Sequence, residues 1–153
     1  MIARAMDMTV IVAESMNHAS NNNRVALNTL LAQSDVVSLH CPLTEQTRNL
    51  IDHRALSAMK PGSWLINTAR GGIVDESALA EALRSGHLAG AGIDVLAEEP
   101  PLSHSVLLAD DSLNVLITPH CAWGSRESRQ RLVDQLAVVI GGFTSGKSVQ
   151  SVI

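Results

Sequence analysis

The chain has 153 residues, of which 46% are hydrophobic and 17% are charged, and its formal net charge is −4. This apolar content is typical of a folded domain rather than a disordered tail, and the scattered Lys and Arg residues form no basic stripe for nucleic acid. No apolar stretch approaches the roughly 20 residues that span a bilayer, the first residues lack a signal-peptide layout, and the two cysteines form no disulfide framework, so we expect a cytoplasmic protein.

Short apolar runs alternate along the chain with longer amphipathic stretches, a pattern that predicts parallel strands linked by helices. The first strand is predicted at Thr9–Ala13, and a helix is predicted to follow at Arg24–Gln33. The second strand, Val36–His40, is closed by Pro42, which cannot donate a hydrogen bond to a neighbouring strand.

Polar residues mark the ends of the next two helices. Asp52 is predicted to cap a short helix through Met59, and the strand Trp64–Asn67 follows that helix. Asp75 is predicted to cap a second helix, and Gly86 stands where a helix favours a left-handed residue after its last turn.

Two buried strands, Ala91–Leu96 and Val115–Thr118, and a last helix, about Ser125–Ile140, complete the pattern. The last helix has a broad apolar face, so we expect it to pack against another surface. Five strands with intervening helices predict a doubly wound α/β fold, in which ligands bind beyond the carboxyl ends of the strands.

Ionisable residues that could take part in catalysis follow three of the predicted strand ends: Arg70, Glu99 and His120. The planar cation of Arg70 suits a carboxylate, and a carboxylate such as Glu99 favours the charged form of an imidazole. Each residue alone is more often structural. Arg70 could form a surface ion pair, Glu99 could be a solvated carboxylate, and His120 could be a structural histidine with its hydrogen bonds satisfied. Together, at successive strand ends of one sheet edge, they predict a catalytic site.

Both cysteines directly follow a histidine, as His40–Cys41 and His120–Cys121. Neighbouring side chains on an extended segment point to opposite sides, so neither pair makes a two-ligand corner. We therefore predict no metal site.

Three long stretches carry a resemblance to a known family: SDVVSLHCPLTEQTRNLID, LINTARGGIVDESALAEALRSGHLAGAGIDVLAEEPP and LITPHCAWGSRESRQRL. They resemble successive signatures of the D-isomer-specific 2-hydroxyacid dehydrogenases, from about Met6 to Phe143. The resemblance implies an enzyme that transfers hydride between NAD and a small 2-hydroxy or 2-oxo acid.

By motif, the resemblance implies that Arg70 holds the substrate carboxylate and polarises the 2-oxo group, that His120 gives a proton to that oxygen, and that Glu99 keeps His120 protonated. Hydride would come from the reduced nicotinamide. These roles agree with the chemistry, because reduction of a ketone develops alkoxide character that a proton donor and a nearby positive charge stabilise.

The resemblance also implies a set of cofactor-binding residues. Asp94 is expected at the nicotinamide end, although a structural carboxylate near a helix end is the alternative for it. The expected cofactor-binding residues of this part of the chain are Cys41, Pro42, Thr68, Ala69, Arg70, Asp94 and His120.

Glu14 follows the first predicted strand, where the family has an acidic residue that binds the adenosine ribose. A carboxylate there accepts a hydrogen bond from the 2′-hydroxyl and repels a 2′-phosphate, so NAD is expected rather than NADP. Ser15 adjoins Glu14, and the alternative for Glu14 is an ordinary exposed glutamate without a binding role.

No G-x-G-x-x-G motif precedes Glu14, so we expect an incomplete, Rossmann-like sheet without its first strand and Gly-rich loop. The expected layout is a partial NAD-binding domain over 1–143 and a tail over 144–153. In the order 3-2-1-4-5-6, the absent strand would lie between Thr9–Ala13 and Trp64–Asn67. Unpaired edges there predict marginal stability, weak NAD binding, and an inactive isolated chain.

Within the family, the T-P-H-C-A-W segment most resembles hydroxypyruvate reductases, also called glycerate dehydrogenases. Phosphoglycerate and lactate dehydrogenases stay open, whereas the formate branch fits less well because Glu99 is retained. Alternatives are an NAD-sensing interaction protein of the corepressor type and a non-catalytic truncated product. A homodimer is expected from the resemblance.

Overall fold

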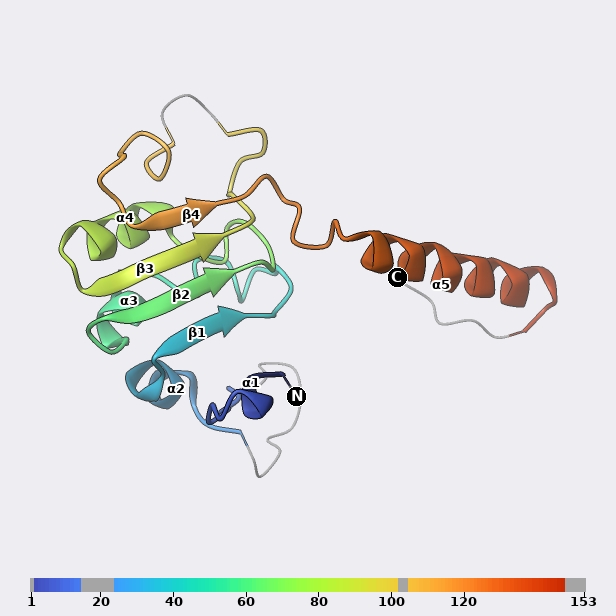
Figure 1. Ribbon diagram of the computed structural model, residues 1–153, viewed down its shortest axis with the longest axis horizontal. Coiled ribbons are helices and arrows are strands. Elements are labelled where there is room, and N and C mark those ends of the chain that lie inside the picture. The colour runs from blue at the N-terminus through green and yellow to red at the C-terminus, as the bar shows by residue number, and fades with distance from the viewer. Residues whose placement is uncertain (1, 15–23, 102–104, 148–153) are drawn as a thin grey trace. The chain divides into compact units, whose positions relative to one another are not determined.

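A parallel sheet of four strands forms the centre of the first of two compact units, Met1–Pro119 and His120–Ile153 (Figure 1). The computed structural model describes residues 2–14, 24–101 and 105–147. The first unit contains α1 (Ile2–Ala5), α2 (Leu27–Gln33), β1 (Val36–Leu39), α3 (His53–Ala58), β2 (Ser63–Asn67), α4 (Glu76–Arg84), β3 (Leu88–Ile93) and β4 (Val115–Ile117). The second contains α5 (Arg126–Thr144).

The strands run in the order β1-β2-β3-β4, and every pair is parallel. Helix α3 lies between β1 and β2 in the sequence, and α4 lies between β2 and β3. Parallel neighbours need such crossover connections, because the chain has to return to the same end of the sheet. The predicted α/β class with a parallel sheet is therefore confirmed.

The prediction of a strand at Thr9–Ala13 is wrong, because the structure forms no strand there. Only Ala13 makes a bridge, to Val25, with Val25 N–H donating to Val12 O at 3.0 Å and Glu14 N–H donating to Val25 O at 2.9 Å. An apolar run needs a partner along its length to become a strand, and one bridge provides none. The bridge also keeps Val25 extended, so α2 begins at Leu27 rather than Arg24.

The predicted place of the second strand is also wrong. The expected order separated Val36–His40 from Trp64–Asn67, whereas β1 pairs directly with β2, with Val37 opposite Leu65. Consecutive strands joined by a short crossover are usually neighbours, and α3 is such a crossover. Val36–Leu39 is therefore the strand next to β2, not an outer strand beyond Thr9–Ala13.

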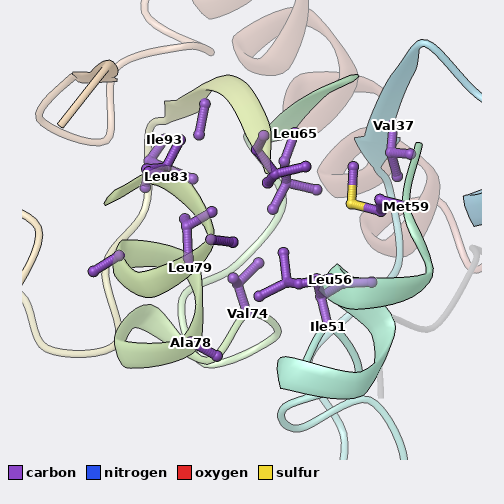
Figure 2. Packing of buried hydrophobic residues seen from close by; sticks show 14 of the residues in the cluster. Val37, Ile51, Leu56, Met59, Leu65, Val74, Ala78, Leu79, Leu83 and Ile93 are labelled. Atoms are coloured by element: carbon purple, nitrogen blue, oxygen red, sulfur yellow. The ribbon is translucent and has the colours of Figure 1, made fainter. Parts of the chain in front are cut away.

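The hydrophobic core lies on one face of the sheet, against α3 and α4 (Figure 2). Alternation of exposed and buried residues in β1 and β2 places Val37 and Leu65 on this face, with relative exposures of 3% and 0%. Leu56 from α3 and Leu79 from α4 are buried with them. On the opposite face, Trp64 remains 41% exposed.

The predicted helix ends are confirmed. The Asp52 carboxylate accepts from Ala55 N–H at 2.8 Å, and Asp75 accepts from the backbone N–H groups of Ser77 and Ala78. Gly86 follows α4 with φ of 72°, a conformation that glycine adopts without steric cost. Both caps satisfy N–H groups that have no partner inside the helix.

The fourth predicted strand is shifted, because β3 runs from Leu88 to Ile93 rather than from Ala91 to Leu96. Its first half contains Gly90, and glycine gives a weak strand signal. A Cβ on Gly90 would lie 2.3 Å from the Trp64 ring, so this glycine makes room for the tryptophan.

The second unit contains α5, which Ser125 caps by accepting from Ser128 N–H at 3.1 Å. No residue within α5 is buried, and Leu132, Leu136 and Phe143 are exposed. The division into a domain over 1–143 and a tail over 144–153 stays a prediction, and residues 148–153 lie outside the described part of the chain.

Candidate functional site

The carboxyl ends of all four strands are in register. Leu39 lies opposite Asn67, Asn67 opposite Ile93, and Ile93 opposite Ile117. The backbone continues this alignment, with Asp94 N–H donating to Asn67 O at 2.9 Å. The segments that leave β1, β2 and β3 therefore begin at one edge of the sheet, where ligands of such folds bind.

A pocket of about 320 Å³ lies where β1 and β2 end. Its lining includes five of the residues expected to bind the cofactor, together with His40: these are Cys41, Pro42, Thr68, Ala69 and Arg70. The structure thus brings together the two predicted groups that are separated by more than twenty positions in the sequence.

Arg70 is exposed at the end of a tight turn that follows β2. Its guanidinium donates from Nη1 to the Ala69 carbonyl at 2.7 Å. The buried Asn67 side chain holds this turn, because its amide donates to Arg70 O and accepts from Ala69 N–H. An exposed guanidinium on a braced turn can receive a small carboxylate in a forked hydrogen bond.

Glu99 lies on the exposed loop after β3, and its Oε1 accepts from Leu96 N–H at 2.8 Å. The next amide, Ala97 N–H, donates to Glu76 Oε1 at 2.6 Å. Two carboxylates thus fix consecutive peptide groups of this loop. The Arg70 turn contacts the same loop, because Gly71 packs against the Leu96 carbonyl.

Asp94 directly follows β3 and is only 4% exposed. The Thr118 hydroxyl donates to its Oδ1 at 2.5 Å. The buried carboxylate is therefore bonded to the half-buried Thr118, and this pair links the ends of β3 and β4. It does not line the pocket of Arg70, so its expected contact with the cofactor stays a prediction.

His120 begins the second unit, and its backbone has a φ of 51°. This left-handed conformation is uncommon for a residue other than glycine, and such residues often lie at functional sites. Trp123 Nε1 donates to the His120 carbonyl at 2.9 Å, and Gly124 N–H donates to Cys121 O at 2.8 Å. These bonds define a turn immediately before α5.

Glu14 is exposed, and its backbone N–H bonds to Val25 O. It does not line the pocket of Arg70. Its neighbour Ser15 lies outside the described residues, so the expected ribose contact stays a prediction.

A second pocket, of about 340 Å³, contains none of the predicted site residues. Asp75, Glu76, Leu96 and Glu98 are among its lining residues. It is slightly larger, but the smaller pocket lies at the strand ends and has the exposed cation. We therefore assign the candidate site to the pocket of Arg70.

The sequence model for the NAD-binding domain of D-isomer specific 2-hydroxyacid dehydrogenases matches residues 1–122. The chain belongs to this family. The prediction made from the three long motifs is thereby confirmed, and so is the expectation of NAD as the cofactor of this type of domain. Relatives in the family are named as dehydrogenases and reductases.

Among these 2-hydroxyacid dehydrogenases, the glycerate dehydrogenase of Methylorubrum extorquens is 46% identical over 145 residues, which are 95% of this chain and 45% of that protein. The hydroxypyruvate reductase of Blautia hydrogenotrophica is 37% identical, over 99% of this chain and 48% of that protein. The chain thus spans about half the length of the curated relatives it matches.

A solved structure of a D-isomer specific 2-hydroxyacid dehydrogenase from Lactobacillus delbrueckii, in an NAD-complexed form, superposes with a TM-score of 0.83 at 35% identity. The superposition covers 99% of this chain and 51% of that one. The family's Rossmann-type NAD-binding domain is therefore the fold of this chain. Among residues 2–14, 24–101 and 105–147, no helix is long and apolar enough to cross a membrane.

No role was predicted for Asn67 or Thr118, although both stand at the ends of predicted strands, whereas the glycines after Arg70 were expected to allow a close approach. Asn67 and Gly71 flank the Arg70 turn, and Thr118 holds Asp94. Their signal was present in part, because a buried asparagine at a strand end and a glycine beside a functional arginine both suggest a special backbone. The partner atoms, however, come from segments far apart in the sequence.

Proposed function

We propose that the chain carries the catalytic residues of an NAD-dependent dehydrogenase that reduces a small 2-oxo acid, of the hydroxypyruvate or glyoxylate type, to the D-2-hydroxy acid. The observation that carries this proposal is the exposed Arg70 guanidinium in the pocket at the ends of β1 and β2. Family membership supplies the chemistry for which such a cation is suited.

In the proposed reaction, the Arg70 guanidinium binds the substrate carboxylate and polarises the 2-oxo group. His120 donates a proton to the carbonyl oxygen, and Glu99 stabilises the charged imidazole that serves as this donor. Proton donation and the positive charge of Arg70 both lower the energy of the alkoxide that develops.

The lining of the Arg70 pocket suits a nicotinamide. Cys41 and Pro42 offer a largely apolar wall for a flat ring, and the carbonyl oxygens of Thr68 and Ala69, which have two lone pairs each, can accept from a carboxamide. A reduced nicotinamide bound there supplies the hydride. We place Asp94 and His120 at its reactive end, and Glu14 at the adenosine ribose, where a carboxylate favours NAD over NADP.

The experiment is an assay of NADH oxidation with a panel of 2-oxo acids. It uses this chain and a version extended upstream, because we propose that the chain by itself turns over little. We expect hydroxypyruvate and glyoxylate to be reduced, and the product to have the D configuration on chiral chromatography. A panel in which neither protein reduces any 2-oxo acid would contradict the proposal and favour an NAD-sensing or non-catalytic role.

Two variants test the assigned roles. Arg70→Gln removes the cation and should lower kcat/KM by roughly 10²- to 10³-fold, and His120→Gln should lower kcat by roughly 10²- to 10⁴-fold. Arg54→Gln is the matched control, because Arg54 is an exposed arginine of α3 outside the pocket. Equal activity of Arg70→Gln and Arg54→Gln would contradict the role of Arg70.

We further propose a homodimer in a reducing, cytoplasmic environment. The two cysteines form no disulfide with each other within the described residues, and Cys121 is exposed, which suits such an environment. Light scattering of the purified protein at several concentrations measures the oligomeric state, and a monomer at all concentrations would contradict the dimer.

A further inference from the structure

Asn67 is the last residue of β2, and only 2% of it is exposed. Its amide oxygen accepts from Ala69 N–H at 3.1 Å, and its amide nitrogen donates to Arg70 O at 3.0 Å. One side chain therefore closes the turn Thr68–Ala69–Arg70 from inside. A buried amide that both donates and accepts has satisfied its main hydrogen-bonding needs within this turn.

The turn determines where the Arg70 guanidinium lies. The guanidinium donates to the carbonyl of Ala69, the same residue whose N–H bonds to Asn67. The Arg70 main chain is bonded to Asn67 as well. Asn67 thus bonds directly to the main chain of Arg70, and the guanidinium bonds to a residue, Ala69, that Asn67 also holds.

Asn67 also connects this turn to the next strand end. Its own carbonyl accepts from Asp94 N–H at 2.9 Å, and Asp94 in turn accepts from the Thr118 hydroxyl. The side chain and main chain of one residue thus join the Arg70 turn to β3. A turn fixed in this way is held to the rigid sheet rather than left as a free loop.

We propose that Asn67 is a positioning residue that sets the Arg70 guanidinium for the carboxylate of the 2-oxo acid. This inference rests on the proposed function of Arg70. Asparagine is suited to the role because it donates to one peptide group and accepts from another. An aspartate has the same shape, but when it is charged its side chain only accepts hydrogen bonds. One of its oxygens would then face the Arg70 carbonyl oxygen and repel it.

A double-mutant cycle with the upstream-extended protein tests the proposal. Asn67→Asp should lower kcat/KM for the 2-oxo acid by roughly 10- to 100-fold, the effect of leaving buried polar groups unpaired. If Asn67 acts through Arg70, the same substitution in an Arg70→Gln background should change kcat/KM by less than about threefold. Equal losses in both backgrounds would overturn the proposal.

Ser63→Ala is the matched control. Ser63 lies on the same strand and the same face, is also 2% exposed, and its hydroxyl has no hydrogen-bond partner among the described residues. Its substitution changes a buried polar group of β2 without touching the Arg70 turn, so kcat/KM should stay within about twofold of the unsubstituted protein.

A second measurement separates this inference from the proposed function. Amide hydrogen exchange at Ala69, measured without substrate, should become faster in Asn67→Asp and in Asn67→Ala and stay unchanged in Ser63→Ala. If the unsubstituted protein shows no turnover, the proposed function is wrong. Exchange at Ala69 would still test whether Asn67 holds the turn of Arg70. Unchanged exchange in both Asn67 variants would overturn the proposal whatever the activity.

Discussion

Gly71 packs directly against the carbonyl of Leu96, so closely that a Cβ built on Gly71 would lie 1.8 Å from that oxygen. The contact joins the turn of Arg70 to the loop in which Leu96 N–H bonds to Glu99. Two segments that carry predicted catalytic residues therefore share one backbone contact. No side chain other than hydrogen fits at position 71 without a shift of one segment.

The first prediction concerns this contact. Gly71→Ala should lower the free energy of unfolding by about 1–3 kcal/mol or more, because a methyl group would overlap the backbone of Leu96. Urea unfolding followed by circular dichroism measures the change. Gly141→Ala is the control, since Gly141 lies in α5 with open space around it, and this substitution should stabilise its helix by up to about 1 kcal/mol. Equal stability of Gly71→Ala and the parent would contradict the packing.

The second prediction concerns the core of the sheet. Leu65→Ala should cost about 2–5 kcal/mol of unfolding free energy, because Leu65 is fully buried and its loss leaves a cavity. Leu116→Ala, on the edge strand β4 of the same sheet, removes the same atoms from a residue that is 69% exposed. Its effect should stay below about 1 kcal/mol, because little of that side chain leaves water on folding. Similar losses for both would argue against the placement of the core.

The third prediction concerns the cap of α4. Asp75→Ala should destabilise the first unit by about 1 kcal/mol, since the Asp75 carboxylate satisfies the N–H groups of Ser77 and Ala78. Asp75→Asn keeps an accepting oxygen and should recover most of the loss. Thermal unfolding of the three proteins provides the measurement, and failure of asparagine to outperform alanine would speak against a capping role.

The fourth prediction concerns pH. Hydrogen bonds from Ser112, and then those from the Arg84 guanidinium, lower the pKa of Asp110 from 3.8 to about 2. A carboxyl group with a lowered pKa stabilises the folded state above its ordinary pKa, and this contribution disappears as the pH falls through about 2. Ser112→Ala should raise the pKa of Asp110 toward 3.8, as an NMR titration of its carboxyl carbon measures.

The control for this titration is Ser57→Ala, whose hydroxyl bonds to the His53 carbonyl within α3. The pKa of Asp110 should be the same in this variant as in the parent. A pKa of Asp110 that does not rise in Ser112→Ala would show that the Ser112 hydroxyl is not its main partner.

Local signals in the sequence predicted the local structure well. Asp52 and Asp75 marked helix starts because a capping carboxylate acts on amides only two or three residues ahead. Gly86 marked a helix end for a similar short-range reason. The groups around Cys41 and Arg70 line one pocket because the carboxyl ends of parallel strands share one edge, and their role in cofactor binding stays a prediction.

Features that depend on partners distant in the sequence were harder to predict. The apolar run Thr9–Ala13 resembles a strand, but strand formation depends on a neighbour that the run itself does not specify. The order of β1 and β2 depends on which crossover joins them. The role of Asn67 depends on two peptide groups in a turn whose shape the residue types alone do not determine.

The chain has two tryptophans and no tyrosine, and Trp64 belongs to the first unit while Trp123 belongs to the second. Near-ultraviolet emission therefore comes from one fluorophore in each unit, without tyrosine as an energy donor. Replacing Trp123 with phenylalanine would leave a single emitter on β2, beside Gly90. Its spectrum would follow the melting of the sheet alone, while far-ultraviolet dichroism would also register the unwinding of α5.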